Sequence, residues 1–169
     1  MSKTLFTEKQ KFRQIWIIAI CAIILILFIW GFIQQVIFKI PWGTNPSSDL
    51  TLTLFGLIPI IIFLLFFRLT LITEVKDDGV YYKFNFFREK FNIIRKENIL
   101  SHKIRTYSPI KEYGGWGIKK SFKKGVGVAY NVSGNVGIQF ELKNGEKILI
   151  GTAFPERFNK AINDIIKKD

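Results

Sequence analysis

The sequence predicts a membrane protein of the α+β class, in which a two-helix transmembrane hairpin precedes a β-barrel or curved sheet that ends in a C-terminal helix. Two long apolar runs without a charged residue, Ile15 to Ile33 and Leu50 to Phe67, lie near the N-terminus. From Arg68 onward, segments of alternating apolar and polar residues are separated by turn residues. The chain closes on Pro155 to Lys168, a segment with one apolar helical face.

Each apolar run is long enough to cross a bilayer. A helix of this length reaches about 28 Å, close to the thickness of the hydrocarbon layer. Inside lipid only a helix or a closed barrel pairs every backbone group. A buried helix of a soluble protein would keep a polar stripe, and neither run has one. A signal peptide would have a shorter apolar stretch followed by small residues at a cleavage site, which Ile15 to Ile33 lacks.

The distribution of lysine and arginine predicts the orientation in the membrane. The N-terminal residues carry four basic side chains, the loop between the runs carries only Lys39, and most of the net charge of +12 lies beyond Arg68. The positive-inside bias therefore places both termini in the cytoplasm of a multi-pass protein of the inner cell membrane. The expected parts are a basic cytoplasmic tail (1–14), the transmembrane hairpin (15–67) and a cytoplasmic domain (68–169).

Two β-hairpins are predicted in the cytoplasmic domain. A two-residue turn at Asp78-Gly79 would oppose Val75 to Tyr82, Thr73 to Phe84 and Leu71 to Phe86. A three-residue loop, Lys143 to Gly145 with a left-handed Gly145, would oppose Phe140 to Ile148 and Ile138 to Ile150. A two-residue loop at Asn144-Gly145 would instead turn both isoleucines away from the core.

Further strands are expected at 92–94, 99–107 and 127–131, followed by the C-terminal helix. The apolar face of that helix consists of Phe158, Ala161, Ile162, Ile165 and Ile166. Pro155 suits the first helical position, and the helix is expected to pack on the sheet.

Three stretches carry a resemblance to a family. They are Tyr113 to Ile118 (YGGWGI), Ala129 to Gln139 (AYNVSGNVGIQ) and Leu149 to Thr152 (LIGT). With the apolar hairpin, they resemble bacterial two-span membrane proteins with a pleckstrin-homology-like (PH-like) domain, from an uncharacterised family. The resemblance implies a PH-like barrel and supplies no activity and no catalytic residues. Lys119 to Gly125 is richer in lysine than the resemblance implies.

The candidate binding residues lie in and before that lysine-rich stretch. Four lysines and one aromatic residue fall within six positions without an acidic residue: Lys119, Lys120, Phe122, Lys123 and Lys124. An exposed loop of this kind suits anionic lipid headgroups or an acidic partner, with Phe122 inserting at the interface; it equally suits a solvated loop that keeps the domain soluble. Trp116, among glycines, is a candidate ligand platform or the filling of a tight bend.

The sequence does not indicate an enzyme. His102 is the only histidine, and the neighbouring Ser101 would point to the opposite face of a strand. We expect no metal, no cofactor and no nucleic acid, because no such motif is present. The predicted function is a membrane-anchored, non-enzymatic interaction module that binds a protein partner or assembles with itself. The alternative is a sensor of anionic lipid or of a small ligand at the membrane surface.

Overall fold

The computed structural model describes residues 3–12, 15–85 and 90–167, with the side chains at 16, 17, 66 and 67 left out. The chain divides into two compact units. Arg13–Arg68 forms one unit, here called the helical hairpin. Met1–Phe12 and Leu69–Asp169 together form the other, here called the β-domain. The helical hairpin is thus inserted in the sequence between two segments of the β-domain.

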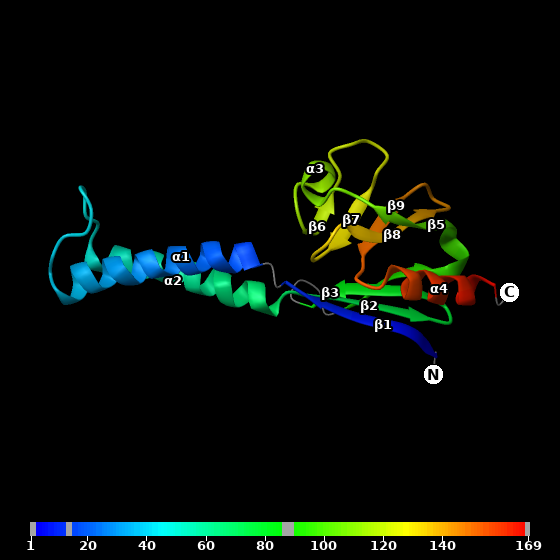
Figure 1. Ribbon diagram of the computed structural model, residues 1–169, viewed down its shortest axis with the longest axis horizontal. Coiled ribbons are helices and arrows are strands. Elements are labelled where there is room, and N and C mark those ends of the chain that lie inside the picture. Colours follow the sequence, from blue (N-terminus) through cyan, green and yellow to red (C-terminus); the bar gives the residue numbers. More distant parts are fainter. Residues whose placement is uncertain (1–2, 13–14, 86–89, 168–169) are drawn as a thin grey trace. The chain divides into compact units, whose positions relative to one another are not determined.

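The helical hairpin consists of α1 (Ile15–Phe32), a π-helical turn (Ile33–Ile37) and α2 (Asp49–Arg68) (Figure 1). By length and composition, one helix among the described residues, Ile18–Ile37, is apolar and long enough to cross a membrane, and little of it is buried. The apolar stretch of α2, Asp49–Leu65, falls short of that length. The sequence predicted that the first helix ends at Ile33. In the structure it continues through the π-helical turn to Ile37.

The β-domain contains two sheets and a C-terminal helix. The first sheet has the order β1-β2-β3-β4, with every neighbouring pair antiparallel. Its strands are β1 (Thr4–Lys11), β2 (Thr70–Lys76), β3 (Gly79–Phe84) and β4 (Asn92–Arg95). The second sheet has the order β5-β8-β9-β7-β6, in which β7 and β9 run parallel. Its strands are β5 (Ile99–Thr106), β6 (Gly117–Lys120), β7 (Val128–Asn131), β8 (Val136–Leu142) and β9 (Lys147–Gly151).

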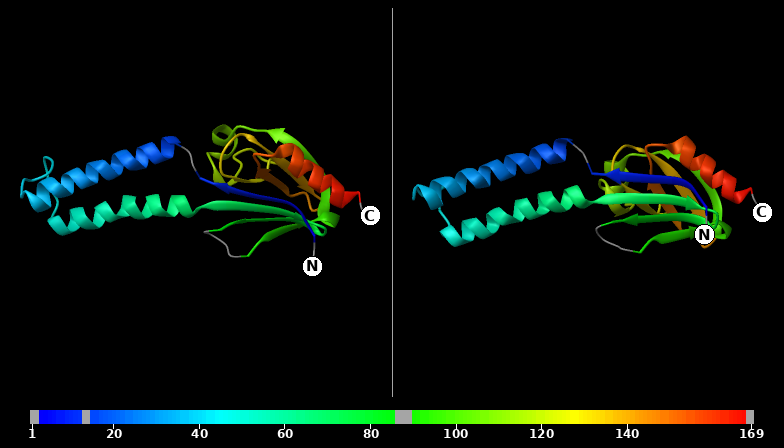
Figure 2. Two further views of the ribbon diagram at one scale, coloured as in Figure 1. Left: turned by 60° about the horizontal axis from the view of Figure 1, so that its bottom comes forward. Right: turned by 90° about the horizontal axis from the view of Figure 1, so that it is seen from below.

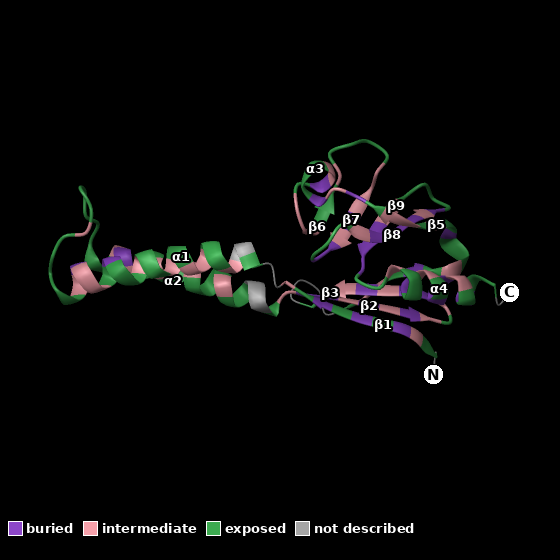
Figure 3. Cartoon of the chain, viewed as in Figure 1, coloured by how far each residue is buried: buried purple, intermediate pink, exposed green. Residues whose placement is uncertain are grey.

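Helix α4 (Pro155–Ile166) closes the core between the two sheets (Figures 1 and 2). Its buried side chains are Phe158, Ala161, Ile162 and Ile165, as the apolar face predicted. Ile166 departs from the prediction, since 37 % of its surface is exposed. In Figure 3, buried residues lie in the strands of the β-domain and in α4, whereas most of α1 and α2 is exposed or intermediate.

The N-terminal segment is a strand, where the sequence predicted a basic tail over 1–14. Thr4–Lys11 pairs with β2, and Phe6 stacks on Phe158 with 5.0 Å between ring centroids. The sequence did not predict this strand, because its other two buried residues, Glu8 and Gln10, are polar. Apolar and polar residues therefore do not alternate along it. Glu8 accepts hydrogen bonds from Thr152 Oγ1 (2.6 Å) and from the backbone N–H of Ala153 (2.9 Å). Buried polar residues with such partners do not oppose folding.

The turn between β2 and β3 lies one residue earlier than predicted. Asp77 and Asp78 form it, so that Val75 pairs with Val80 rather than Tyr82, and Leu71 with Phe84. A two-residue shift of pairing keeps each side chain on its predicted face. Phe86, the predicted partner of Leu71, lies outside the described residues.

Glycine at 79 is needed in the strand rather than in the turn. A Cβ there would lie 2.3 Å from the carbonyl oxygen of Ile94 in β4. The side chain of Asp78 holds the turn by accepting a hydrogen bond from the Tyr81 hydroxyl (2.6 Å) and by pairing with Arg95.

The predicted β8–β9 hairpin is confirmed. Phe140 pairs with Ile148 and Ile138 with Ile150. Gly145 has a φ of +84°, and its N–H donates to the carbonyl of Leu142 (2.9 Å). The three-residue loop therefore places both isoleucines on the core side of the sheet.

Candidate functional site

The lysine-rich stretch forms the end of a β-hairpin. Strands β6 and β7 pair from Gly117 opposite Asn131 to Lys120 opposite Val128. We call Lys119 to Gly125 the lysine loop. Its lysines are exposed, as the sequence predicted, but Lys119 and Lys120 belong to strand β6 rather than to a loop.

The lysine loop is held against the short helix α3 (Pro109–Tyr113). The carbonyl of Glu112 accepts from Ser121 Oγ (2.9 Å) and from the backbone N–H of Phe122 (3.2 Å). The Glu112 carboxylate accepts from the backbone N–H of Ser108 (2.8 Å) and pairs with Arg105. These bonds join Ser121 and Phe122 to α3, and through Glu112 and Arg105 to the second sheet.

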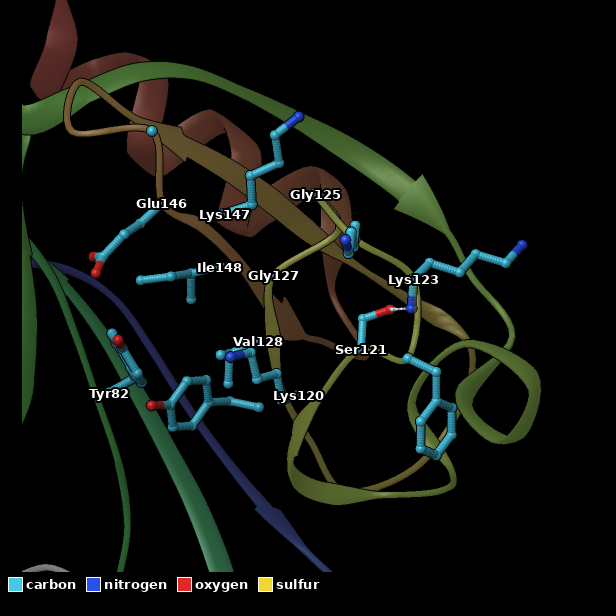
Figure 4. Close-up of a pocket in the computed structure, with 14 residues that line it drawn as sticks. Tyr82, Lys120, Ser121, Lys123, Gly125, Gly127, Val128, Glu146, Lys147 and Ile148 are labelled. Carbon is cyan, nitrogen blue, oxygen red and sulfur yellow. Dashed lines mark hydrogen bonds between the residues drawn. The ribbon is translucent and has the colours of Figure 1, made fainter.

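A pocket of about 580 Å³ opens beside the lysine loop (Figure 4). We call it the lysine pocket. Its lining comes from the loop, from β3, β7 and β9, and from the β8–β9 turn: Tyr82, Lys120, Ser121, Phe122, Lys123, Lys124, Gly125, Gly127, Val128, Tyr130, Gly145, Glu146, Lys147 and Ile148. The lining thus includes four lysines and one glutamate beside apolar and aromatic residues. In Figure 4 the Lys123 and Lys147 side chains extend away from the pocket. Of the predicted site residues, Lys120, Phe122, Lys123 and Lys124 meet here, and Lys119 and Trp116 do not.

Strand alternation separates Lys119 from Lys120. Neighbouring residues of a strand point to opposite faces of the sheet. Lys120 lies opposite Val128, which lines the lysine pocket. Lys119 lies opposite Ala129, which is buried in the cluster on the other face with Leu149. The two lysines are therefore neighbours in sequence with different surroundings.

Gly127 brings the lysine loop close to β9. A Cβ at Gly127 would lie 1.8 Å from the carbonyl oxygen of Lys147, and its φ is +89°. A residue with a side chain would have to push the start of β7 away from β9. Glycine at 127 is thus required for Lys147 and the lysine loop to share one pocket.

Trp116 lies outside the lysine pocket. Its indole Nε1 donates to the carbonyl of Gly134 (3.1 Å), and the side chain is half-buried, so it neither lines the pocket nor fills the core. The adjacent Gly117 N–H donates to Asn131 Oδ1 (2.9 Å), and Asn131 Nδ2 donates to the Tyr107 hydroxyl (2.9 Å). Burial raises the pKa of Tyr107 to about 12.

Ser101 and His102 do not form a nucleophile–base pair. Ser101 Oγ donates to Glu141 (3.2 Å), whereas the His102 ring stacks on Phe140 with 6.4 Å between centroids. Burial lowers the pKa of His102, so its imidazole is neutral at pH 7. The hydrogen bond from Lys147 lowers the pKa of Glu141.

The fold and the site define a class: an α+β protein with a basic pocket in its β-domain and an apolar helical insertion. Among the described residues, no group of three or more His, Cys, Asp or Glu could hold a metal ion. No protein-family model, curated protein or solved structure matches this chain.

Proposed function

We propose that this chain is a two-span membrane protein whose β-domain is a non-enzymatic interaction module at the inner face of the membrane. In this proposal the module binds a protein partner or a second copy of itself. Both termini lie in the cytoplasm, and the β-domain is PH-like.

Support for two membrane spans comes from the surface of the helical hairpin. Large apolar side chains are exposed along both helices, among them Ile26 (64 %) and Leu54 (56 %). Contiguous apolar surface of this extent requires lipid or protein cover. The phenylalanines at 66 and 67 extend the apolar sequence of α2 beyond Leu65, which brings it to the length of a span.

Support for a PH-like β-domain comes from its layers. Two sheets face one another, and α4 packs against both at one end (Figure 2). A small two-sheet domain of this kind carries functions in its loops, and its fold does not imply catalysis.

One observation carries the interaction role: Phe122 is 76 % exposed although the loop that bears it is fixed. Its backbone N–H is bonded to α3, and its ring lies close enough to Gly114 that a Cβ there would be 2.8 Å from Cζ. A pre-positioned aromatic among lysines has the composition of an interface anchor with a charged rim. The matching partner surface is apolar at its centre and acidic around it.

Photo-crosslinking in native membranes tests this role. A photoreactive phenylalanine analogue replaces Phe122 in one full-length variant and Phe154, which is 49 % exposed on the β9–α4 connection, in a control variant. We expect recurrent protein adducts, or dimers of this chain, at position 122 and not at 154. Equal adduct patterns at the two positions would contradict the proposal.

The lysine pocket favours a second candidate function, a sensor of anionic lipid or of a small ligand. Its volume and its four lysines suit an anion better than a flat protein surface. In the crosslinking experiment this function would give lipid adducts at position 122.

A further inference from the structure

We infer that the lysine pocket binds an organic phosphate, whose phosphate group lies beside Lys120 and whose apolar or aromatic body lies against Tyr130 and Ile148. This inference is independent of a protein partner. It deepens the second candidate function by naming the chemical class of the ligand and the face of β6 that recognises it.

The size of the pocket suits a small molecule. Its volume of about 580 Å³ lies within the range of about 300–1,000 Å³ that is common for ligand sites. Its walls come from segments far apart in sequence, from Tyr82 to Ile148. The folded domain therefore builds the pocket, and its lining is not a single flexible loop.

The positive charge of the lysines that line the pocket favours an anionic ligand. Lys120, Lys123 and Lys124 form no ion pair within the described residues, and Lys147 pairs with Glu141 (2.6 Å). Lys120 and Lys124 bring uncompensated positive charge to the pocket, which attracts an anion. The Lys123 and Lys147 side chains extend away from the pocket (Figure 4). A phosphate group offers three acceptor oxygens and up to two negative charges, which lets several ammonium groups share it.

The apolar part of the pocket calls for more than an inorganic ion. Val128 and Ile148 line the pocket with Tyr130, whose ring meets that of Tyr82 edge to face at 4.6 Å between centroids. An aromatic or alkyl group attached to the phosphate would cover this surface and gain from leaving water. Glu146 also lines the pocket and offers an acceptor for a ligand hydroxyl.

The two adjacent lysines of β6 provide a matched test. Lys120→Gln and Lys119→Gln remove the same charge one residue apart, but only Lys120 lines the pocket. Both side chains are exposed, so neither change removes a core contact. Any effect of net charge alone is equal in the two variants.

The experiment uses the full chain in nanodiscs and measures binding of a fluorescent adenosine diphosphate. A second arm measures a fluorescent phosphatidic acid in nanodiscs of otherwise neutral lipid, which separates a soluble ligand from a lipid headgroup. Inorganic phosphate and adenosine serve as competitors. We expect saturable binding in at least one arm, about tenfold weaker in Lys120→Gln and changed less than twofold in Lys119→Gln.

The competitors test the two halves of the ligand. Inorganic phosphate is expected to displace the bound probe only weakly, and adenosine alone not to displace it. Equal weakening by the two lysine variants would overturn the inference, because it would show unspecific charge attraction. Absence of saturable binding in both arms would overturn it as well, while leaving a protein partner at Phe122 unaffected.

Discussion

At the residue scale, the turns and the pocket depend on glycines in different ways. Gly145 has a positive φ and open space around its Cα, whereas Gly127 combines a positive φ with close contact to the β9 backbone. The sequence predicted the first from its place between two alternating runs. It could not predict the second, because Lys147 is distant in sequence and the contact exists only once β7 lies parallel to β9.

Gly145→Val is expected to lower the free energy of unfolding of the β-domain by about 1–3 kcal/mol. The reason is that Gly145 has a positive φ, which a β-branched residue adopts only with steric strain. Asn144→Ala removes the acceptor for the Glu146 N–H (3.0 Å) and is expected to cost about 1 kcal/mol or less, since that bond is exposed. Thermal unfolding of the full chain in detergent measures both. An equal loss of stability in the two variants would contradict the three-residue loop with a left-handed Gly145.

Gly127→Ala is expected to cost more than Gly125→Ala. Both positions have positive φ, +89° and +78°, but nothing lies within 4 Å of a Cβ at Gly125. The conformational cost, about 1 kcal/mol, is therefore common to both variants, and the clash with Lys147 is added only at 127. Stability and probe binding are measured together. A smaller effect at 127 than at 125 would rule out the close approach of β7 to β9.

His102 is expected to reduce stability as the pH falls from about 7 to 5. Burial lowers its pKa in the folded state below the reference value of 6.5, so the unfolded chain takes up a proton first and unfolding becomes easier. Hydrogen bonds from Tyr81 and Lys147 lower the pKa values of Asp78 and Glu141 below their ordinary values of 3.8 and 4.5, so the stability that these carboxylates contribute is lost only at a lower pH. In His102→Gln the loss of stability between pH 7 and 5 should shrink. An unchanged profile would be inconsistent with a half-buried, neutral imidazole.

At the element scale, β1 is the feature that the sequence hides. Its inward residues are Phe6, Glu8 and Gln10, and two of them are polar. An alternation of apolar and polar residues is therefore absent, and the segment resembles a basic tail. The partners that make burial acceptable, Thr152 and Gly151, lie at the other end of the chain. By contrast, α4 and the β8–β9 hairpin were predictable, because apolar spacing and a local turn determine them.

Glu8→Ala is expected to lower stability by about 2 kcal/mol or more, because the Thr152 hydroxyl and the Ala153 N–H lose their acceptor inside the protein. Lys9→Ala, one residue along β1 on the exposed face, should change stability by about 0.5 kcal/mol or less. Chemical denaturation of the full chain compares the two. Similar values would show that β1 does not join the core as described.

At the scale of the whole molecule, the β-domain is assembled from segments on both sides of the helical hairpin. The last pair of the β1–β2 ladder is Lys11 with Thr70, and the N–H of Phe12 donates to the carbonyl of Leu69 (3.4 Å). The chain therefore leaves and re-enters the β-domain at neighbouring positions. The sequence predicted a cytoplasmic domain that begins at residue 68. That boundary leaves out β1, which pairs with β2 and belongs to the β-domain.

A shortened chain tests this assembly. Residues 3–12 joined to 69–169 by a short glycine-serine linker are expected to give a folded, soluble domain with a cooperative thermal transition. The fragment 69–169 alone lacks β1 and should unfold or aggregate, because Phe158 and Val75 lose their cover. Equal behaviour of the two would show that β1 is dispensable.

The central claim is that a two-span hairpin is inserted into one cytoplasmic domain, and cysteine labelling in intact cells tests it most directly. With Cys21 replaced by alanine, single cysteines are placed at Thr4, Ser47 and Asp164, which are all exposed. The account predicts that a membrane-impermeant maleimide labels only position 47, and labels 4 and 164 after permeabilisation. Labelling of 4 and 164 from opposite sides of the membrane would contradict it, because β1 and α4 belong to the same core.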